Sequence, residues 1–265
     1  MHRHVVAPVR TARDLLREER EQVAAERAAF RRFESGVEDL SLPGSTSTGP
    51  SGVPSMRTTT LSTSVGGSSD PLAAVRCVYR ETVMAVDHFG SVYDESLAEH
   101  LASELGQDIA TGVVCGGPST FTESFRETLL GAARTARTSR EGLIDALDVE
   151  SAALDDADRT LRDIVEAADD LRGTTRSGPL PARREDDGPE CPCTRLAALQ
   201  ERCETTVTDR QRRLGDPVVD SHSLDGHALC RYLYHDADWT YPVLTAATTL
   251  ADDLTALART LDCEE

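Results

Sequence analysis

Apolar residues recur every seven positions along the first part of the chain. The series is Val9, Leu16, Val23, Phe30 and Val37. Charged residues fill the positions between them, and this spacing is typical of an amphipathic helix with a coiled-coil-type seam. The second position of the seam is less regular, because Glu19 and Glu26 occupy it. The pattern predicts a helix over 7–40 that packs against another helix of the same chain.

A longer stretch of helical periodicity occupies the middle of the chain. Apolar positions alternate by four and three from Phe125 to Leu171, and Glu150 falls within this series. The pattern predicts one helix of about fifty residues, roughly 75 Å long at 1.5 Å per residue. Thr120 and Glu123 have the spacing of a capping box that would open this helix.

Shorter amphipathic stretches surround these two helices. Asp70-Pro71 and the Ser96/Glu99 pair are N-terminal capping signals, and Gly106 is a stop signal. The predicted shorter helices cover 71–88, 96–105, 107–114, 196–214, 227–239 and 243–261. Since no stretch alternates as a strand does, the predicted fold class is all-α, with long amphipathic helices in antiparallel bundle or coiled-coil-like packing.

Two stretches break the helical pattern and predict flexible linkers. Residues 41–70 are rich in Ser, Thr, Gly and Pro, and residues 173–190 are rich in charge and proline. Such segments bury too little apolar surface to offset the entropy lost on ordering. The linkers divide the chain into an N-terminal helix over 1–40, a central helical region over 71–172 and a C-terminal helical hairpin over 191–265, which we expect to pack on the central helices.

The charge of the chain indicates the environment in which the protein works. The formal net charge is -18, from 46 acidic and 28 basic residues, and the chain contains no Lys and no Asn. An acidic, Lys-free chain suits concentrated intracellular salt, where a Debye length of about 3 Å screens self-repulsion. These features predict a haloarchaeal protein. Counterion release drives little nucleic-acid binding in such salt, so we expect no nucleic-acid partner.

The start of the chain, MHRHVVAPVRTARDLL, lacks the apolar core of a signal peptide. No apolar run approaches the roughly 18 residues that cross a bilayer. We therefore expect a cytoplasmic protein that does not enter the membrane. The chain contains seven cysteines, an odd number, and without an export signal we expect reduced thiols rather than a disulfide framework.

The sharpest candidate for chemistry is a zinc site in the C-terminal region. Zinc takes four tetrahedral nitrogen or sulfur ligands, usually from two close pairs. Cys191 and Cys193 form one pair, and His227 and Cys230 form the other. The alternative is that the cysteines are unligated, as the place of Cys203 in a helical seam indicates. No cofactor is expected under that alternative.

A second cluster of polar residues lies in the central region. It contains Tyr79, Arg80, Glu81, His88 and Tyr93. If the helices that carry them form a hairpin, these groups could converge for acid–base chemistry. The alternative, which we favour, is a structural polar network in which Arg80 pairs with a carboxylate.

Four arginines follow the central cluster along the long predicted helix. They are Arg126, Arg134, Arg137 and Arg140. With a net charge of -18 and no interleaved aromatic residues, a solvated helix face that pairs with nearby Glu and Asp is favoured over a nucleic-acid stripe.

The segment 77–110, CVYRETVMAVDHFGSVYDESLAEHLASELGQDIA, resembles a family of haloarchaeal proteins of unknown function. The matching stretches are YRETVMAV at 79–86 and YDESLAE at 93–99, with weaker similarity at 17–20 and 202–211. The resemblance implies a helical chain with a charged heptad segment and a C-terminal hairpin, and it implies no activity. The Cys-Pro-Cys at 191–193 is not a feature of that family, which argues against a family-wide metal site.

These patterns describe packing more than chemistry. We therefore expect a non-enzymatic helical scaffold that binds a protein partner or a second copy of itself. The alternative is a zinc- or thiol-dependent sensor that uses the C-terminal Cys and His residues.

Overall fold

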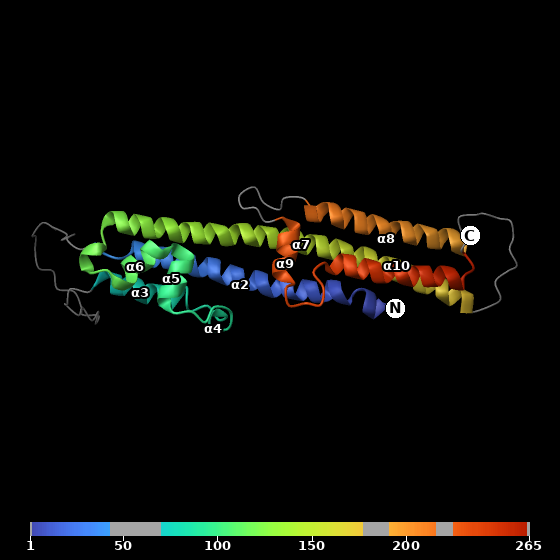
Figure 1. The fold of residues 1–265 in the computed structure, drawn as a ribbon, viewed down its shortest axis with the longest axis horizontal. Helices are drawn as coiled ribbons and strands as arrows, with labels where there is room; N and C mark the ends of the chain where they lie inside the picture. Colours follow the sequence, from blue (N-terminus) through green and yellow to red (C-terminus); the bar gives the residue numbers. More distant parts are fainter. Residues whose placement is uncertain (1, 43–69, 177–190, 216–224, 264–265) are drawn as a thin grey trace, which may run out of the picture. The chain divides into compact units, whose positions relative to one another are not determined.

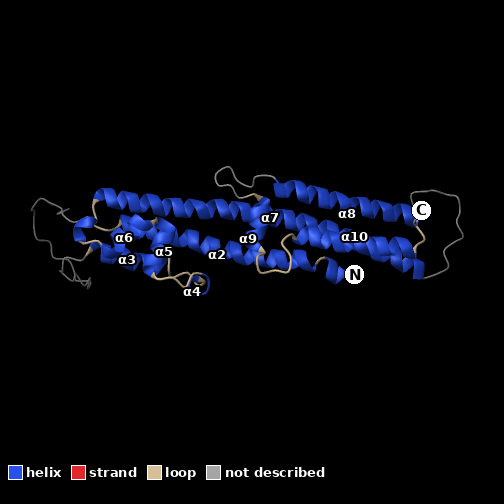
Figure 2. Ribbon diagram, in the orientation of Figure 1, coloured by secondary structure: helices blue, strands red, loops and turns tan. Residues whose placement is uncertain are grey.

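The computed structural model describes residues 2–42, 70–176, 191–215 and 225–263, and every element in these ranges is a helix (Figure 2). The predicted all-α fold class is thereby confirmed. The elements are α1 (His2–Val5), α2 (Ala7–Glu38), α3 (Pro71–Thr82), α4 (Phe89–Val92), α5 (Leu97–Leu105), α6 (Gln107–Cys115), the 3₁₀ turn η1 (Pro118–Thr120), α7 (Glu123–Arg176), α8 (Pro192–Gly215), α9 (Gly226–Leu233) and α10 (Pro242–Thr260).

The chain forms two compact units, and both long helices contribute to each. Unit 1 comprises residues 1–21 and 142–265, and unit 2 comprises residues 22–141. The 32 residues of α2 and the 54 residues of α7 therefore each pass from one unit to the other. The boundary between the units falls within α2 and α7, after residues 21 and 141, and not at the predicted linkers.

In unit 2, the second half of α2 and the first half of α7 are covered by α3, α5 and α6 (Figure 1). Gly36 allows α3 to approach α2 closely, because a Cβ at this position would lie 2.5 Å from Val78 Cγ1. The buried core contains Phe30, Phe33, Leu72, Val75, Tyr79, Leu101, Ile109, Val113, Phe121 and Leu129. This packing brings polar side chains from α2, α5 and α7 to one place.

In unit 1, α8 and α10 pack against each other in antiparallel orientation (Figure 1). The start of α8 lies beside the end of α10, while Cys203 in mid-α8 lies against the carbonyl of Ala247 early in α10. Ion pairs from Arg13 to Asp158 and from Arg20 to Asp148 show that α2 runs antiparallel to α7 here. The apolar series from Val243 to Leu261 is buried, as its four-and-three spacing predicts.

The helix ends differ from the sequence prediction at several places. The helix predicted over 227–239 is shorter, because α9 ends at Leu233. The helix that opens at Pro71 ends at Thr82 instead of near His88, because the backbone amides of Val83 and Met84 both bond to the carbonyl of Tyr79 and close it. The cap of α7 is Thr122, whose hydroxyl accepts from the amide of Phe125, and not Thr120.

A further difference concerns the predicted linkers. Helix α7 continues to Arg176, so residues 173–176 belong to it. The rest of the predicted linkers, residues 43–69 and 177–190, lies outside the described residues. The Ser96/Glu99 capping box is confirmed, and the helix predicted over 196–214 is present as α8, which ends at Gly215.

None of the described helices is both long and apolar enough to cross a membrane.

Candidate functional site

The centre of the polar site in unit 2 is the carboxylate of Glu26 on α2. One of its oxygens accepts a hydrogen bond from the Tyr93 hydroxyl at 2.7 Å and lies 2.9 Å from Nε2 of His88. Its other oxygen accepts from Nε of Arg140 at 3.0 Å. Glu26 is 8% exposed, so this carboxylate depends on its protein partners in place of water.

Arg140 on α7 joins Glu26 to a second carboxylate. Its two terminal nitrogens donate to both oxygens of Glu104 on α5, each at 2.6 Å. The guanidinium lies over the ring of Phe30, 4.8 Å from its centroid. All three nitrogens of Arg140 therefore have acceptors, and the residue holds α2, α5 and α7 together as a clamp.

A neutral pair lies beside this clamp. The hydroxyl of Tyr79 on α3 is 2.8 Å from Nδ1 of His100 on α5, and His100 is 2% exposed. The rings of Phe89 and Tyr93 pack edge-to-face against the imidazole, and Phe33 packs in the same way on Tyr79. These contacts fix both groups within the core.

Burial and hydrogen bonding set the protonation of these groups. Burial raises the pKa of Tyr79 and of Tyr93, so both hydroxyls stay protonated. Burial also lowers the pKa of His100, despite the nearby charges of Glu104 and Glu95. Burial opposes ionisation of Glu26, but the hydrogen bonds from Tyr93 and His88 and the charge of Arg140 outweigh it, so the pKa of Glu26 lies below its usual value.

The hydrogen bonds of this arrangement connect several helices of unit 2. The ionised Glu26 is occupied by three donors, and the Tyr79 hydroxyl and the His100 imidazole are bonded to each other. A general acid or base must reach a proton of the reacting molecule. In this structure the Glu26 carboxylate, the Tyr79 hydroxyl and the His100 imidazole bond to other side chains. These bonds join α2, α3, α5, α7 and the chain between α3 and α5.

The structure brings together part of the predicted polar cluster. Tyr79 and His100 form one pair, and His88 and Tyr93 bond to Glu26. Arg80 and Glu81 are exposed and are not among the bonded groups of this network. They follow Tyr79 directly on α3, and each residue along a helix turns by about 100°, so they face away from the site.

Sequence reasoning missed the two residues that connect this cluster, Glu104 and Arg140. Arg140 is not on a solvated face as predicted, although Arg134 and Arg137 do pair with Glu34, Glu38 and Glu141. The sequence feature that could have indicated this role of Arg140 is Glu26, a carboxylate at a seam position where an apolar residue is expected.

Unit 1 contains a second buried ion pair. The terminal nitrogens of Arg210 on α8 donate to both oxygens of Glu150 on α7, at 2.9 and 2.7 Å. The Cys230 sulfur lies 3.4 Å from Arg210, and the Tyr234 hydroxyl lies 3.5 Å from Glu150. Burial raises the pKa of the Cys230 thiol to about 12, so this sulfur stays protonated. Within the described part of the chain, Nε of Arg210 has no hydrogen-bond acceptor.

The predicted zinc ligands are not assembled into a site. The sulfur of Cys193 is bonded to Cys263, so it is no thiolate ligand, and Cys230 is buried beside Arg210. His227 is exposed and lies 3.1 Å from the Tyr241 hydroxyl. Among the residues that the structure describes, no group of three or more His, Cys, Asp or Glu side chains could hold a metal ion.

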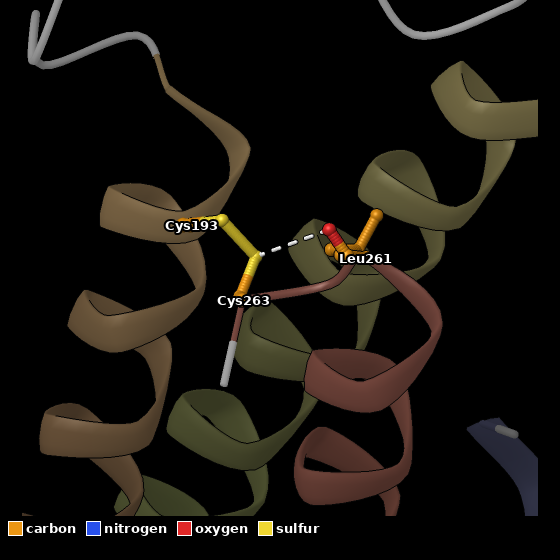
Figure 3. The surroundings of a disulfide bond; sticks show 3 residues. All are labelled: Cys193, Leu261 and Cys263. Carbon is orange, nitrogen blue, oxygen red and sulfur yellow. Dashed lines mark hydrogen bonds between the residues drawn. A yellow bond between two sulfur atoms is a disulfide. The ribbon is translucent and has the colours of Figure 1, made fainter. Parts of the chain in front are cut away.

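The expectation that the thiols are all reduced is also wrong. A disulfide joins Cys193, in the first turn of α8, to Cys263, just after α10 (Figure 3). The antiparallel packing of these helices places the two Cα atoms 5.4 Å apart, which is within the range for a disulfide. Counting cysteines could not reveal this pairing. Cys203 is 2% exposed in the seam, where the sequence places it.

Comparison with known proteins gives one family and no assigned activity. Residues 7–258 match the model of a family described as a domain of unknown function, DUF7260. No curated protein and no solved structure matches the chain. The match covers α2 to most of α10, including both buried arginines and their carboxylate partners. The chain therefore belongs to the DUF7260 family.

Proposed function

We propose that this protein is a non-enzymatic helical scaffold that binds a protein partner or a second copy of itself. The supporting observation is how the polar groups of unit 2 are used. The carboxylate of Glu26 and the guanidinium of Arg140 hold helices in fixed positions, with every nitrogen of Arg140 bonded. Groups used in this way make a stiff support for a surface.

The surface of the helices offers sites for such a partner. Val92 in unit 2 and Val149 in unit 1 are 54% and 60% exposed. Scattered apolar residues are normal on a protein surface, but they stand out on a chain with a net charge of -18. In concentrated salt, charge repulsion between such chains is screened and apolar contacts are strengthened.

The composition supports a cytoplasmic role in a haloarchaeon as part of this proposal. A chain with 46 acidic residues and no lysine should need high salt to fold. Helix content measured by circular dichroism while KCl is lowered tests this point. Full helix content at about 0.1 M KCl would count against a halophilic origin.

Light scattering after gel filtration in about 2–3 M KCl tests the scaffold proposal. We expect a dimer or larger assembly of the full chain, or a partner retained by cross-linking in an extract prepared at the same salt. The variant Val92→Asp should weaken the assembly if unit 2 carries the interface, whereas Ala98→Asp, at a nearby exposed position, should not. A chain that stays monomeric at all concentrations and retains no partner would overturn the proposal.

A second candidate function is a thiol-dependent sensor, and the disulfide favours it. Cys191 is a free, half-buried thiol that is separated from the bonded Cys193 by Pro192 alone. Mass spectrometry after differential alkylation, with the protein taken directly from cells under oxidising and reducing conditions, tests this role. A sensor requires the fraction of bonded Cys193–Cys263 to change between the two conditions, and an unchanged fraction would reject it.

A further inference from the structure

Two adjoining cavities in unit 1 are both lined by Arg210, the arginine of the Arg210–Glu150 pair. The larger has a volume of about 420 Å³ and is lined by α7, α8 and α9. The smaller, of about 100 Å³, shares Ala153, Asp156, Arg210 and Arg213 with it. The larger cavity falls within the 300–1,000 Å³ range of small-molecule sites.

The larger cavity has an apolar wall and a cationic end. Its apolar side chains are those of Ala146, Val149, Ala152, Ala153, Leu214 and Leu229. Val149, on this wall, is 60% exposed. An apolar molecule in the cavity would cover it.

Two arginines provide the cationic end. Arg210 is 5% exposed, and its Nε is a buried donor without an acceptor among the described residues. A buried polar group without a partner is unfavourable, and Arg210 lines both cavities, so a ligand acceptor that reached this donor would remove the penalty. Arg213, one helical turn later, is exposed and has no carboxylate partner within the described ranges.

The acidic residues around the cavities limit the charge of a ligand. Glu150 is paired with Arg210, Asp156 with Arg159, and Asp209 with Arg212. Arg213 is thus the cation left without a counter-charge. A ligand with one negative charge would balance it, whereas a phosphate with two charges would meet the three carboxylates nearby.

We propose that this cavity binds a small amphipathic carboxylate, with its carboxylate on Arg210 Nε and Arg213 and its apolar body against Val149, Leu214 and Leu229. Both oxygens of the ligand would then have charged donors, and the apolar body would leave water. The inference does not depend on the scaffold proposal.

Isothermal titration calorimetry with sodium octanoate, at one fixed KCl concentration, tests this site on the full chain. We expect one octanoate per chain with a dissociation constant on the order of 1 mM. Octanamide has the same apolar body without the charge, and acetate has the charge without the body. Both should bind at least about tenfold more weakly.

Two matched arginine variants separate the site from the general charge of the helix. Arg213→Gln should weaken octanoate binding about tenfold. Arg212→Gln removes the neighbouring arginine, which pairs with Asp209 and does not line the cavity, so octanoate should bind it as it binds the wild type. Both positions are exposed, and unchanged circular dichroism would show that both variants fold.

A cavity-filling variant provides an independent check. Ala152 is an exposed position that lines the larger cavity, so Ala152→Phe should block the apolar body of the ligand and abolish octanoate binding. The proposal would be overturned by no saturable binding up to about 20 mM octanoate, by equal binding of octanamide, or by equal effects of Arg212→Gln and Arg213→Gln.

Discussion

The two units each contain an arginine bonded to glutamate, half-buried in unit 2 and buried in unit 1, and they differ in whether every nitrogen has an acceptor. In unit 2, Arg140 donates from all three nitrogens to Glu26 and Glu104. In unit 1, Arg210 donates from its terminal nitrogens to Glu150, and its buried Nε has no acceptor in the described chain. Every nitrogen of the first arginine therefore has an acceptor, whereas Nε of the second has none among the described residues.

The difference shows how similar chemistry serves different roles. A buried ion pair with all its hydrogen bonds made fixes the geometry of its helices, although it adds little net stability over an apolar core. A buried pair with one donor unused and a cavity beside it is prepared for another molecule. We therefore assign a structural role to Arg140 and a binding role to the Nε of Arg210.

The largest expected effect is the loss of stability when each arginine is replaced by methionine. The two variants leave different numbers of carboxylates without a cation. Arg140→Met would leave two carboxylates, the buried Glu26 and the half-buried Glu104, without their cation and should lower the free energy of unfolding by about 3–5 kcal/mol. Arg210→Met would leave one, Glu150, and should cost less. Denaturant unfolding followed by circular dichroism measures both losses.

The control for these variants is an exposed arginine of α7. Arg134 pairs with Glu38, and both side chains are about half exposed, so Arg134→Met should change stability by less than about 1 kcal/mol. An Arg140→Met variant as stable as Arg134→Met would show that the network of unit 2 does not hold its helices together.

The next effect concerns the covalent link that unit 1 has at Cys193–Cys263. Removing it with Cys263→Ser opens a loop with a sequence separation of 70 and should lower the stability of unit 1 by about 2–4 kcal/mol. Hydrogen exchange followed by mass spectrometry should show faster exchange in α8 and α10. The matched control is Cys115→Ser, which removes an exposed free thiol of unit 2. Equal exchange in the two variants would contradict a stabilising role for the disulfide.

The smallest effect is a pH dependence that belongs to unit 2. Unfolded His100 takes up a proton near pH 6.5, whereas burial lowers its pKa in the folded chain. Below about pH 6.5 the unfolded state therefore binds more protons, and stability should fall as the pH falls. The pKa of Glu26 lies below its ordinary value of 4.5, which adds a second loss below about pH 4.5.

His100→Gln isolates the first of these losses. Glutamine can keep a hydrogen bond to Tyr79 but does not titrate, so the decline in the free energy of unfolding between pH 6.5 and 5 should become shallower. The charged groups around His100, namely Glu95, Glu104, Arg140 and Glu26, stay in place. An unchanged slope in urea unfolding across this range would assign the decline to other groups.

Much of the fold could be predicted from the sequence, because helical periodicity reports directly on burial. The seam from Val9 to Val37 is buried throughout, and the spacing of Val243 to Leu261 predicts α10. The end of α3 at Thr82 could not be predicted, since no glycine or proline marks it and the carbonyl of Tyr79 closes the helix.

The polar sites could be predicted only in part, because their members come from distant segments. The signal was present in two places: Glu26 and Glu150 both fall in apolar seams, and each is the buried acceptor of an arginine. Which arginine pairs with each glutamate depends on the antiparallel register of the helices. The sequence alone does not determine that register. The Cys193–Cys263 pairing depends on the same kind of register.

Nuclear magnetic resonance of the arginine Nε–H groups tests the contrast between the two arginines most directly. With ¹⁵N-labelled arginine and with Arg140→Lys and Arg210→Lys to assign the signals, both groups can be followed while octanoate is added. We predict that the Arg140 signal, bonded to Glu26, exchanges slowly with water and does not move, whereas the Arg210 signal shifts with saturation. An Arg210 signal as protected and as unresponsive as that of Arg140 would contradict the binding role of Arg210.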